Sequence, residues 1–458
     1  MSRDTMTMRS TIAPPSTWQT WGWHFAQGTA CGLYVKIIGS LSLLEVYLLA
    51  TLPARLGQFV RCASTRGVVL FTILWIGWIA GAVMADLVNG TQWSLAARGI
   101  ARAFFAGFVT LCLIPIWMRS PRAFEAFLAG SPVAQVIGLK YFRSGTYNTG
   151  DGTAMIDASV LGWDSFGNYV ATAAVAFLIA RHWRRHPWAC AGLALGLGAV
   201  NIALGSRAAG ITQIAAGAVM PIFILQPHFE AGWWSRIGRL GPGRLLVAAV
   251  IGVAALAVTT KSYSHLARSG VLGEKAKIKY EAQISVKGGI IAGGRSEFLI
   301  GLAAVLDKPL TGHGSWPEDT IGYAERASER FGVEIREPKT PKNFRKFIKA
   351  HSAIVGAWVD HGILAAVFWL YVFYLVATNF WRVTQYLPDY TGVVIFNCCG
   401  FFWHFFFSPI QSRGYTAILL VPILIIQIKR LQAGHILRHP GRVRSVREPH
   451  PEHVAIPA

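Results

Sequence analysis

The chain has 458 residues, of which 53% are hydrophobic and only 14% are charged. A soluble domain usually carries about 25% charged residues, so the composition excludes an ordinary soluble protein and indicates a membrane protein with several spans. The net charge of +21 fits the concentration of Lys and Arg on the cytoplasmic side of such proteins, with anionic lipid or a phosphate-bearing substrate as the alternative cause. Nucleic-acid binding is not expected, because no basic stretch is interleaved with aromatic residues in a soluble module.

The N-terminal region is the least regular part of the predicted topology. Residues 1–16 are polar and predict a disordered cytoplasmic tail. The apolar run from Trp18 to Leu52 is broken by Lys36, Gly39 and Glu45, which predicts either one span with a half-helix or a tight pair of spans. The arginine-rich stretch 53–67 that follows predicts a cytoplasmic loop.

Ten further spans are predicted after this region. In chain order they are Gly67–Val88, Leu95–Met118, Ala123–Leu139, Asn168–Ala180, Ala189–Gly205, Ala208–Leu225, Leu245–Thr260, Ser352–Phe380, Gly392–Phe407 and Tyr415–Ile428. Strict alternation places every strongly basic short loop on one side, which is the cytoplasmic side. The sequence therefore predicts an all-α transmembrane bundle of about 12 spans, with a distorted first pair.

The predicted organisation has one long non-membrane segment. Transmembrane helices occupy 17–260 and 351–430, a long periplasmic loop occupies 261–350, and 431–458 is a basic cytoplasmic tail. Long loops cross the membrane largely regardless of charge, so the lysines of this loop do not contradict its external position. The six cysteines lack metal-ligand spacing and are interpreted as small apolar core residues.

The long loop carries an apolar helix and many basic residues. The helix, Phe298–Leu306, is expected either to rest on the bilayer surface or to form a small core within the loop. The basic side chains could attract anionic headgroups or a carrier phosphate, or could simply form a solvated face. They include Lys275, Lys277, Lys279, Arg345, Lys346 and Lys349.

Three ionisable residues, far apart in sequence, are predicted to lie at the outer face. Arg207 ends one predicted outward span, Arg295 lies in the external loop, and His351 directly precedes the span that begins at Ser352. Ionisable groups near the apolar slab are costly and often functional. Alone, Arg207 could be a snorkelling residue and His351 an interfacial one. The coincidence of all three favours a site.

The residue types of this site indicate group transfer from a lipid diphosphate. Arginine presents a planar fork of donors that matches phosphate oxygens. A neutral histidine can accept a proton from a hydroxyl at neutral pH. No convincing Asp-x-Asp metal motif is predicted on this face, and the arginines could stabilise the departing diphosphate in place of a metal. No cofactor or metal is therefore expected.

Three motifs around the long loop resemble the O-antigen ligase and O-antigen polymerase family. GSRAAGITQIAAG (Gly205–Gly217) is similar to the family's Ser-Arg-Gly span. GGRSEFLIGLAAVLDKPLTGHG (Gly293–Gly314) is similar to its loop motif, and HSAIVGAWVDHGILAAVFWL to its His-Asn span. Ser352 stands where the family commonly has Asn, and Asp360-His361-Gly362 where it often has Glu-x-Gly.

This resemblance implies an inverting glycosyl transfer at the periplasmic face of the bacterial inner membrane. By it, Arg207 and Arg295 bind the undecaprenyl diphosphate of a glycan donor, and His351 is the base. Ser206, His313 and Asp360 are expected to support the site, and His313, between two turn glycines, is expected to have a backbone role first. The acceptor would be a lipid A-core sugar, another lipid-linked glycan or a protein hydroxyl.

A membrane transporter of an anionic or glycolipid substrate is the alternative. A transporter typically has internal repeats and discontinuous helices at the membrane midplane. No internal repeat is found, and the predicted charges gather at one face, which favours the enzyme.

Overall fold

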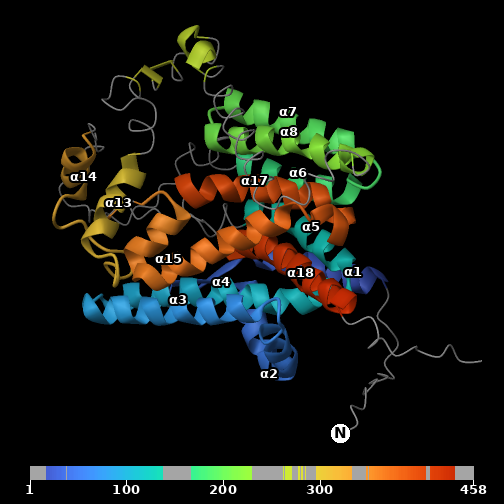
Figure 1. Cartoon of the computed structure of the whole chain (residues 1–458), viewed down its shortest axis with the longest axis horizontal. Helices are drawn as coiled ribbons and strands as arrows, with labels where there is room; N and C mark the ends of the chain where they lie inside the picture. The colour runs from blue at the N-terminus through green and yellow to red at the C-terminus, as the bar shows by residue number, and fades with distance from the viewer. Residues whose placement is uncertain are drawn as a thin grey trace, which may run out of the picture.

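The described part of the chain is almost entirely helical in a computed structural model. The structure describes residues 17–37, 39–137, 167–229, 296–332, 347–348, 350–408 and 413–438, with short pieces between 261 and 284. Helices run side by side through most of the molecule, and two short helices lie at one end, on the left of Figure 1. Of the described residues, only Tyr34–Ile37 (β1) and Gly39–Ser42 (β2) form strands, paired in an antiparallel hairpin.

The N-terminal region consists of one short helix and one longer helix that is a candidate span. Helix α1 (Thr17–Ala30) is followed by the hairpin and by α2 (Leu43–Ala63). The residues that interrupted the apolar run are explained by this order, because Glu45 closes a capping box with Ser42 at the start of α2. The expected loop at 53–67 is wrong for most of its length, since α2 continues to Ala63 through Pro53.

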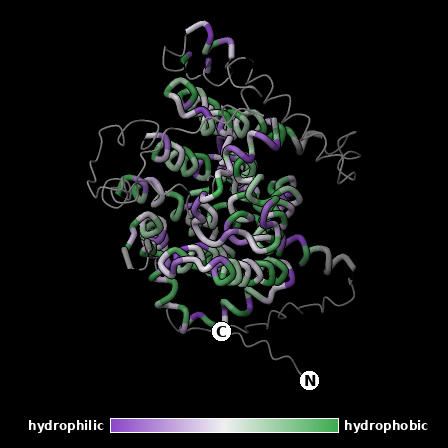
Figure 2. Tube along the Cα trace, turned by 90° about the vertical axis from the view of Figure 1, so that its left-hand side faces the viewer, coloured by the Kyte–Doolittle hydropathy of each residue, from purple (hydrophilic) through white to green (hydrophobic). Residues whose placement is uncertain are grey.

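Seven helices in the described part of the chain are long and apolar enough to cross a membrane. Their membrane-spanning segments are Leu43–Ala63 (α2), Val69–Val88 (α3), Trp93–Arg119 (α4), Arg207–Leu225 (in α8, Arg207–Phe229), Ala353–Phe380 (α15), Pro388–Phe407 (ending with α17, Thr391–Phe407) and Thr416–Ala433 (in α18, Arg413–Arg438). In Figure 2, hydrophobic (green) residues are frequent along the packed helices, with hydrophilic (purple) residues among them. The described helices are therefore consistent with an all-α membrane protein that has several spans.

Three predicted spans are shorter helices, and one lies outside the described residues. The shorter helices are α5 (Pro121–Ile137), α6 (Asn168–His182) and α7 (Pro187–Ala203). At 1.5 Å per residue, helices of this length reach roughly 23–26 Å, somewhat less than a hydrocarbon core of about 30 Å. The predicted span 245–260 is not described, so the total of about 12 stays a prediction.

The described helices of the long loop pack into a small core together with the start of α15. It contains α13 (Ser296–Asp307) and α14 (Tyr323–Phe331). Ile300, Ala304 and Val305 of α13 are buried in a hydrophobic cluster with Tyr323 of α14 and Val355 of α15. The predicted helix at 298–306 is thus confirmed, and its packing favours the loop-core interpretation over a helix resting on the bilayer.

Candidate functional site

The first turn of α13 meets the residue that leads into α15. His351 Nδ1 lies 4.0 Å from Glu297 Oε1, and the His351 side chain is 46% exposed. Ser352 caps α15 by accepting the Val355 N–H, and its hydroxyl donates to the carbonyl of Phe405 at the end of α17. These contacts fix the direction in which the chain enters α15. His351 is therefore anchored through its backbone while its ring stays open to a ligand.

Arg207 is the first residue of α8 and is partly buried. Near the other end of α8, Phe223 stacks on Trp381 with ring centroids 5.3 Å apart, and Trp381 directly follows α15. Both helices run along the bundle in Figure 1, so their first residues lie toward the same end. Arg207 thus lies at the end of the bundle that carries His351. Arg295 lies outside the described residues, although α13 begins at the next residue, Ser296.

Two of the predicted supporting residues have other partners. The carboxylate of Asp360 accepts a hydrogen bond from Arg102 of α4 at 2.5 Å, and the same guanidinium lies 5.6 Å from the centre of the Trp316 ring. Ser206 precedes α8, and its carbonyl accepts the Gly210 N–H. Asp360 therefore pairs with a cation inside the protein.

Helix α15 is broken at Gly362, where φ is 70° and ψ is −162°. An L side chain rarely adopts this backbone conformation, and a Cβ added here would lie 2.2 Å from the carbonyl oxygen of Leu310. In an unbroken helix, the N–H of Ile363 would donate to the carbonyl of Val359. The break removes this bond and leaves the carbonyls of Val359 and Asp360 available to another partner.

A segment of the long loop supplies the missing partners. We call Leu310–Trp316 the wedge. The N–H groups of His313 and Gly314 donate to the carbonyls that the break leaves available, at 2.7 and 3.0 Å, and Leu310 accepts the Ile363 N–H at 3.1 Å. Backbone polar groups in a membrane protein must be paired within the protein. The wedge therefore completes the broken helix.

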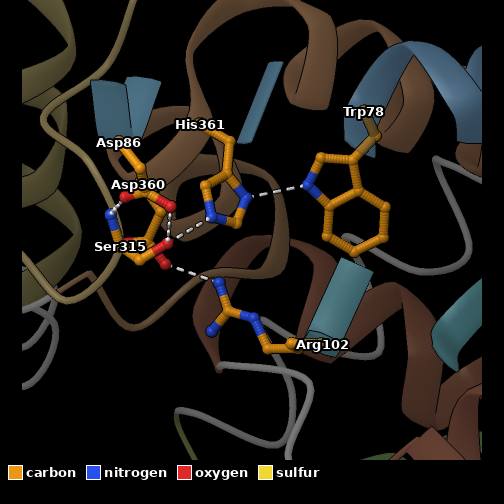
Figure 3. A network of polar contacts seen from close by, with 6 residues as sticks. All are labelled: Trp78, Asp86, Arg102, Ser315, Asp360 and His361. Atoms are coloured by element: carbon orange, nitrogen blue, oxygen red, sulfur yellow. Dashed lines mark hydrogen bonds and ion pairs between the residues drawn. The ribbon is translucent and has the colours of Figure 1, made fainter. Parts of the chain in front are cut away.

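A directed chain of hydrogen bonds holds the wedge from its other side (Figure 3). The indole of Trp78 donates to His361 Nδ1 at 2.9 Å, so the neutral ring carries its proton on Nε2. His361 Nε2 lies 3.1 Å from Ser315 Oγ, and Ser315 donates from Oγ and from its backbone N–H to the Asp86 carboxylate, at 2.9 and 2.6 Å. Every donor in this series of hydrogen bonds has an acceptor.

The direction of this chain argues against a catalytic serine. In a nucleophilic triad the histidine accepts the serine proton, whereas here His361 donates toward Ser315. His361 is fully buried and Ser315 is 1% exposed. A Cβ added at Gly99 of α4 would fall 1.8 Å from Ser315 Oγ, so α4 closes directly over this hydroxyl. The network is therefore interpreted as structural.

His313 takes part in the wedge through both its backbone N–H and its ring. Besides its N–H bond to α15, its Nε2 lies 2.9 Å from the carbonyl of Ala304 in α13. Burial lowers the pKa of His313 below its ordinary value of 6.5, and Lys308 adds to the effect, although the bond to Ala304 opposes it. Tyr323 donates to Asp307 beside it at 2.6 Å. His313 thus links the wedge to α13 as a neutral ring.

A cavity of about 420 Å³, open to the surface, is lined by residues of α13 and α14. Its lining consists of Ala303, Asp307, Tyr323, Arg326, Glu329 and Arg330. Carboxylate and guanidinium groups are strong hydrogen-bond acceptors and donors, so such a lining suits a ligand rich in hydroxyl groups.

Sequence reasoning missed Glu297 and the four residues of the hydrogen-bond chain. Glu297 stands two residues after Arg295, and its nearness to His351 depends on how α13 packs on α15. Asp86 offered a usable signal, because it is an acidic residue inside an otherwise apolar predicted span. Nothing in the sequence connects Asp86 with Ser315, which follows 229 residues later.

Comparison with known proteins adds no family assignment. No protein-family model matches the sequence, and no curated protein matches it.

Proposed function

We propose that this protein is a membrane glycosyltransferase. It would move a glycan from a polyprenyl diphosphate to an acceptor hydroxyl at the outer face of the membrane, as an O-antigen ligase or polysaccharide polymerase does. The observation that carries the proposal is the contact of His351 Nδ1 with the Glu297 carboxylate at the start of α13. This helix directly follows Arg295.

The first support is the environment of His351. A carboxylate beside Nδ1 can orient an imidazole and favour the tautomer with the proton on Nδ1, which leaves Nε2 able to accept a proton. Because the His351 side chain is 46% exposed, an acceptor can approach it. The contact with Glu297 spans 4.0 Å, which a bound substrate would have to shorten for a direct hydrogen bond.

The second support is the position of the two arginines in the chain. Arg207 is the first residue of α8, and Arg295 immediately precedes the first residue of α13. Helix N-termini present unpaired N–H groups and the positive end of the helix dipole, which favour phosphate. An arginine at such a position adds a bidentate donor. Both arginines are therefore proposed to hold the diphosphate.

The proposed reaction is a single displacement. The acceptor oxygen attacks the anomeric carbon, and the bond between this carbon and the phosphate oxygen breaks. The electron pair leaves with the diphosphate, whose charge Arg207 and Arg295 stabilise. The proton of the acceptor hydroxyl passes to Nε2 of His351. Because one displacement occurs at the anomeric carbon, its configuration inverts.

The cavity on α13 and α14 is a candidate for the glycan beyond the reacting sugar. It lies on the same helix as Glu297, and its lining can bond several hydroxyl groups. The acceptor could be a lipid A-core sugar, another glycan or a protein side chain, and the membrane position is proposed to be the bacterial inner membrane with the site facing the periplasm.

A transfer assay in reconstituted membranes tests the role of His351. Removal of a positioned base typically costs about 10²–10⁴-fold in rate, so we expect His351→Ala to lose most transfer and to keep donor binding. His313→Ala is the comparison, because His313 is bonded to Ala304 and α15 and should act through folding. The assignment is wrong if His313→Ala abolishes transfer and His351→Ala transfers at the parent rate.

A further inference from the structure

Two arrangements compete for the same backbone groups in α15. In one, α15 is unbroken and the N–H of Ile363 donates to its own helix. In the other, which is the observed one, the wedge takes the two free carbonyls and accepts the Ile363 N–H. The wedge cannot leave without stranding these groups or straightening the helix. The bend of α15 and the docking of the wedge are therefore one event.

The docked wedge also connects the two helices that meet at His351. The wedge begins three residues after the end of α13, and the indole of Trp358 in α15 donates to the carbonyl of Pro309 between them at 2.7 Å. In the middle of α13, a Cβ added at Gly301 would lie 2.8 Å from the Cβ of Ala350, the neighbour of His351. Helix α13 thus packs closely on the entry to α15, and the wedge follows directly from its C-terminal end.

We infer that Ser315 is a positioning residue for His351. Its hydroxyl and its N–H tie the wedge to Asp86 of α3, and its oxygen accepts from His361 beside the bend. Through the wedge, these bonds fix the first turns of α15 against α13 and hold His351 beside Glu297. That Ser315 holds His351 beside Glu297 is argued from geometry alone. That this position matters for catalysis rests on the proposed function.

Cross-linking tests the structural part without any activity. Cysteines introduced by Glu297→Cys and His351→Cys are joined with a short bis-methanethiosulfonate reagent in the full-length protein in nanodiscs. Mass spectrometry identifies the joined pair among the native cysteines. Adding Ser315→Ala leaves Asp86 and His361 with unpaired buried groups, so we expect the rate of cross-linking to fall roughly tenfold.

A matched control and a milder variant keep this test decisive. Ser269 is another serine of the long loop, and its exposed hydroxyl donates to the carbonyl of Leu266 in its own turn. Ser269→Ala should cross-link at the parent rate. Trp78→Phe keeps an aromatic ring and removes the donor to His361, so its rate of cross-linking should lie between the rates of the parent and Ser315→Ala. It replaces Ser315→Ala in the test if that variant does not fold. Parent-like cross-linking in Ser315→Ala, or in Trp78→Phe where only that variant folds, overturns the inference.

Kinetics test the catalytic part in the chain that keeps Glu297 and His351. Small displacements of a catalytic group can cost about 10²-fold, so Ser315→Ala should lower kcat at least tenfold and change KM for the donor little. An unchanged kcat in a variant whose cross-linking has fallen contradicts the positioning role. If the parent transfers no glycan, the proposed function fails, while the cross-linking result still decides whether Ser315 positions residue 351.

Discussion

Two histidines ten residues apart, His351 just before α15 and His361 within it, have opposite environments. His361 is fully buried, and both of its ring nitrogens have partners, Trp78 and Ser315. The side chain of His351 is 46% exposed, and only one of its nitrogens faces Glu297. A base needs a nitrogen that the acceptor can reach, so the proposed chemistry belongs to His351 and the structural network to His361.

The arginines give the sharpest prediction at this scale. If each holds the diphosphate with two parallel bonds, Arg295→Lys should not restore what Arg295→Ala loses, because lysine is a point charge. The same should apply to Arg207. Each charge-assisted contact removed should cost about 1.5–3 kcal/mol in donor binding. Titration of the reconstituted protein with donor measures this loss, and parent-like affinity in both alanine variants would rule out the diphosphate site.

At the scale of elements, helices with a continuous apolar pattern were predictable, and polar breaks were not. The predicted spans 67–88 and 95–118 agree within two residues with Val69–Val88 and Trp93–Arg119. The predicted end of α2 was wrong, because the charge density at 53–67 predicts a loop. In the structure Arg55 stays in α2, where its guanidinium donates to the hydroxyl of Tyr47 on the other side of Pro53. Local patterns cannot show such a bond in advance.

The wedge gives an element-scale prediction about pH. Burial lowers the pKa of His313 below 6.5. Just below pH 6.5, His313 therefore binds a proton in the unfolded chain and stays neutral in the folded chain. The contribution of neutral His313 to stability is fully present above pH 6.5 and is lost as the pH falls through its folded pKa. We expect the melting temperature to fall more between pH 7.5 and 5.5 in the parent than in His313→Asn. Equal falls in both proteins would contradict the assignment.

At the scale of the whole molecule, the structure gathers one end of several helices around the long loop. Ser315 and Lys308 of the loop bond Asp86 and Asn89 at the end of α3, and Phe298 of α13 lies near Phe407 at the end of α17. The turn after α3 and the long loop were both predicted to be external by charge alternation. Their contact is consistent with a common side of the membrane.

The candidate site was predictable in its residue types and incomplete in its connections. Charge alternation was enough to suggest that Arg207 and His351 share one end of the bundle, and the direction of α8 relative to α15 agrees with this. Asp86 stood out as an acidic residue in an apolar span, but its bonds to Ser315 and the contact of Glu297 with His351 could not be assigned, because they depend on how the long loop packs on the helices. A single glycine in an apolar span does not by itself predict a break.

The products of one incubation test the central claim most directly. Reconstituted protein is mixed with a glycan on polyprenyl diphosphate and a hydroxyl acceptor, and mass spectrometry and NMR identify what forms. The account predicts the glycan joined to the acceptor with inverted anomeric configuration, together with free polyprenyl diphosphate that retains both phosphates. Retention of configuration, release of polyprenyl monophosphate, or movement of the intact donor across the membrane without a new glycosidic bond would contradict it.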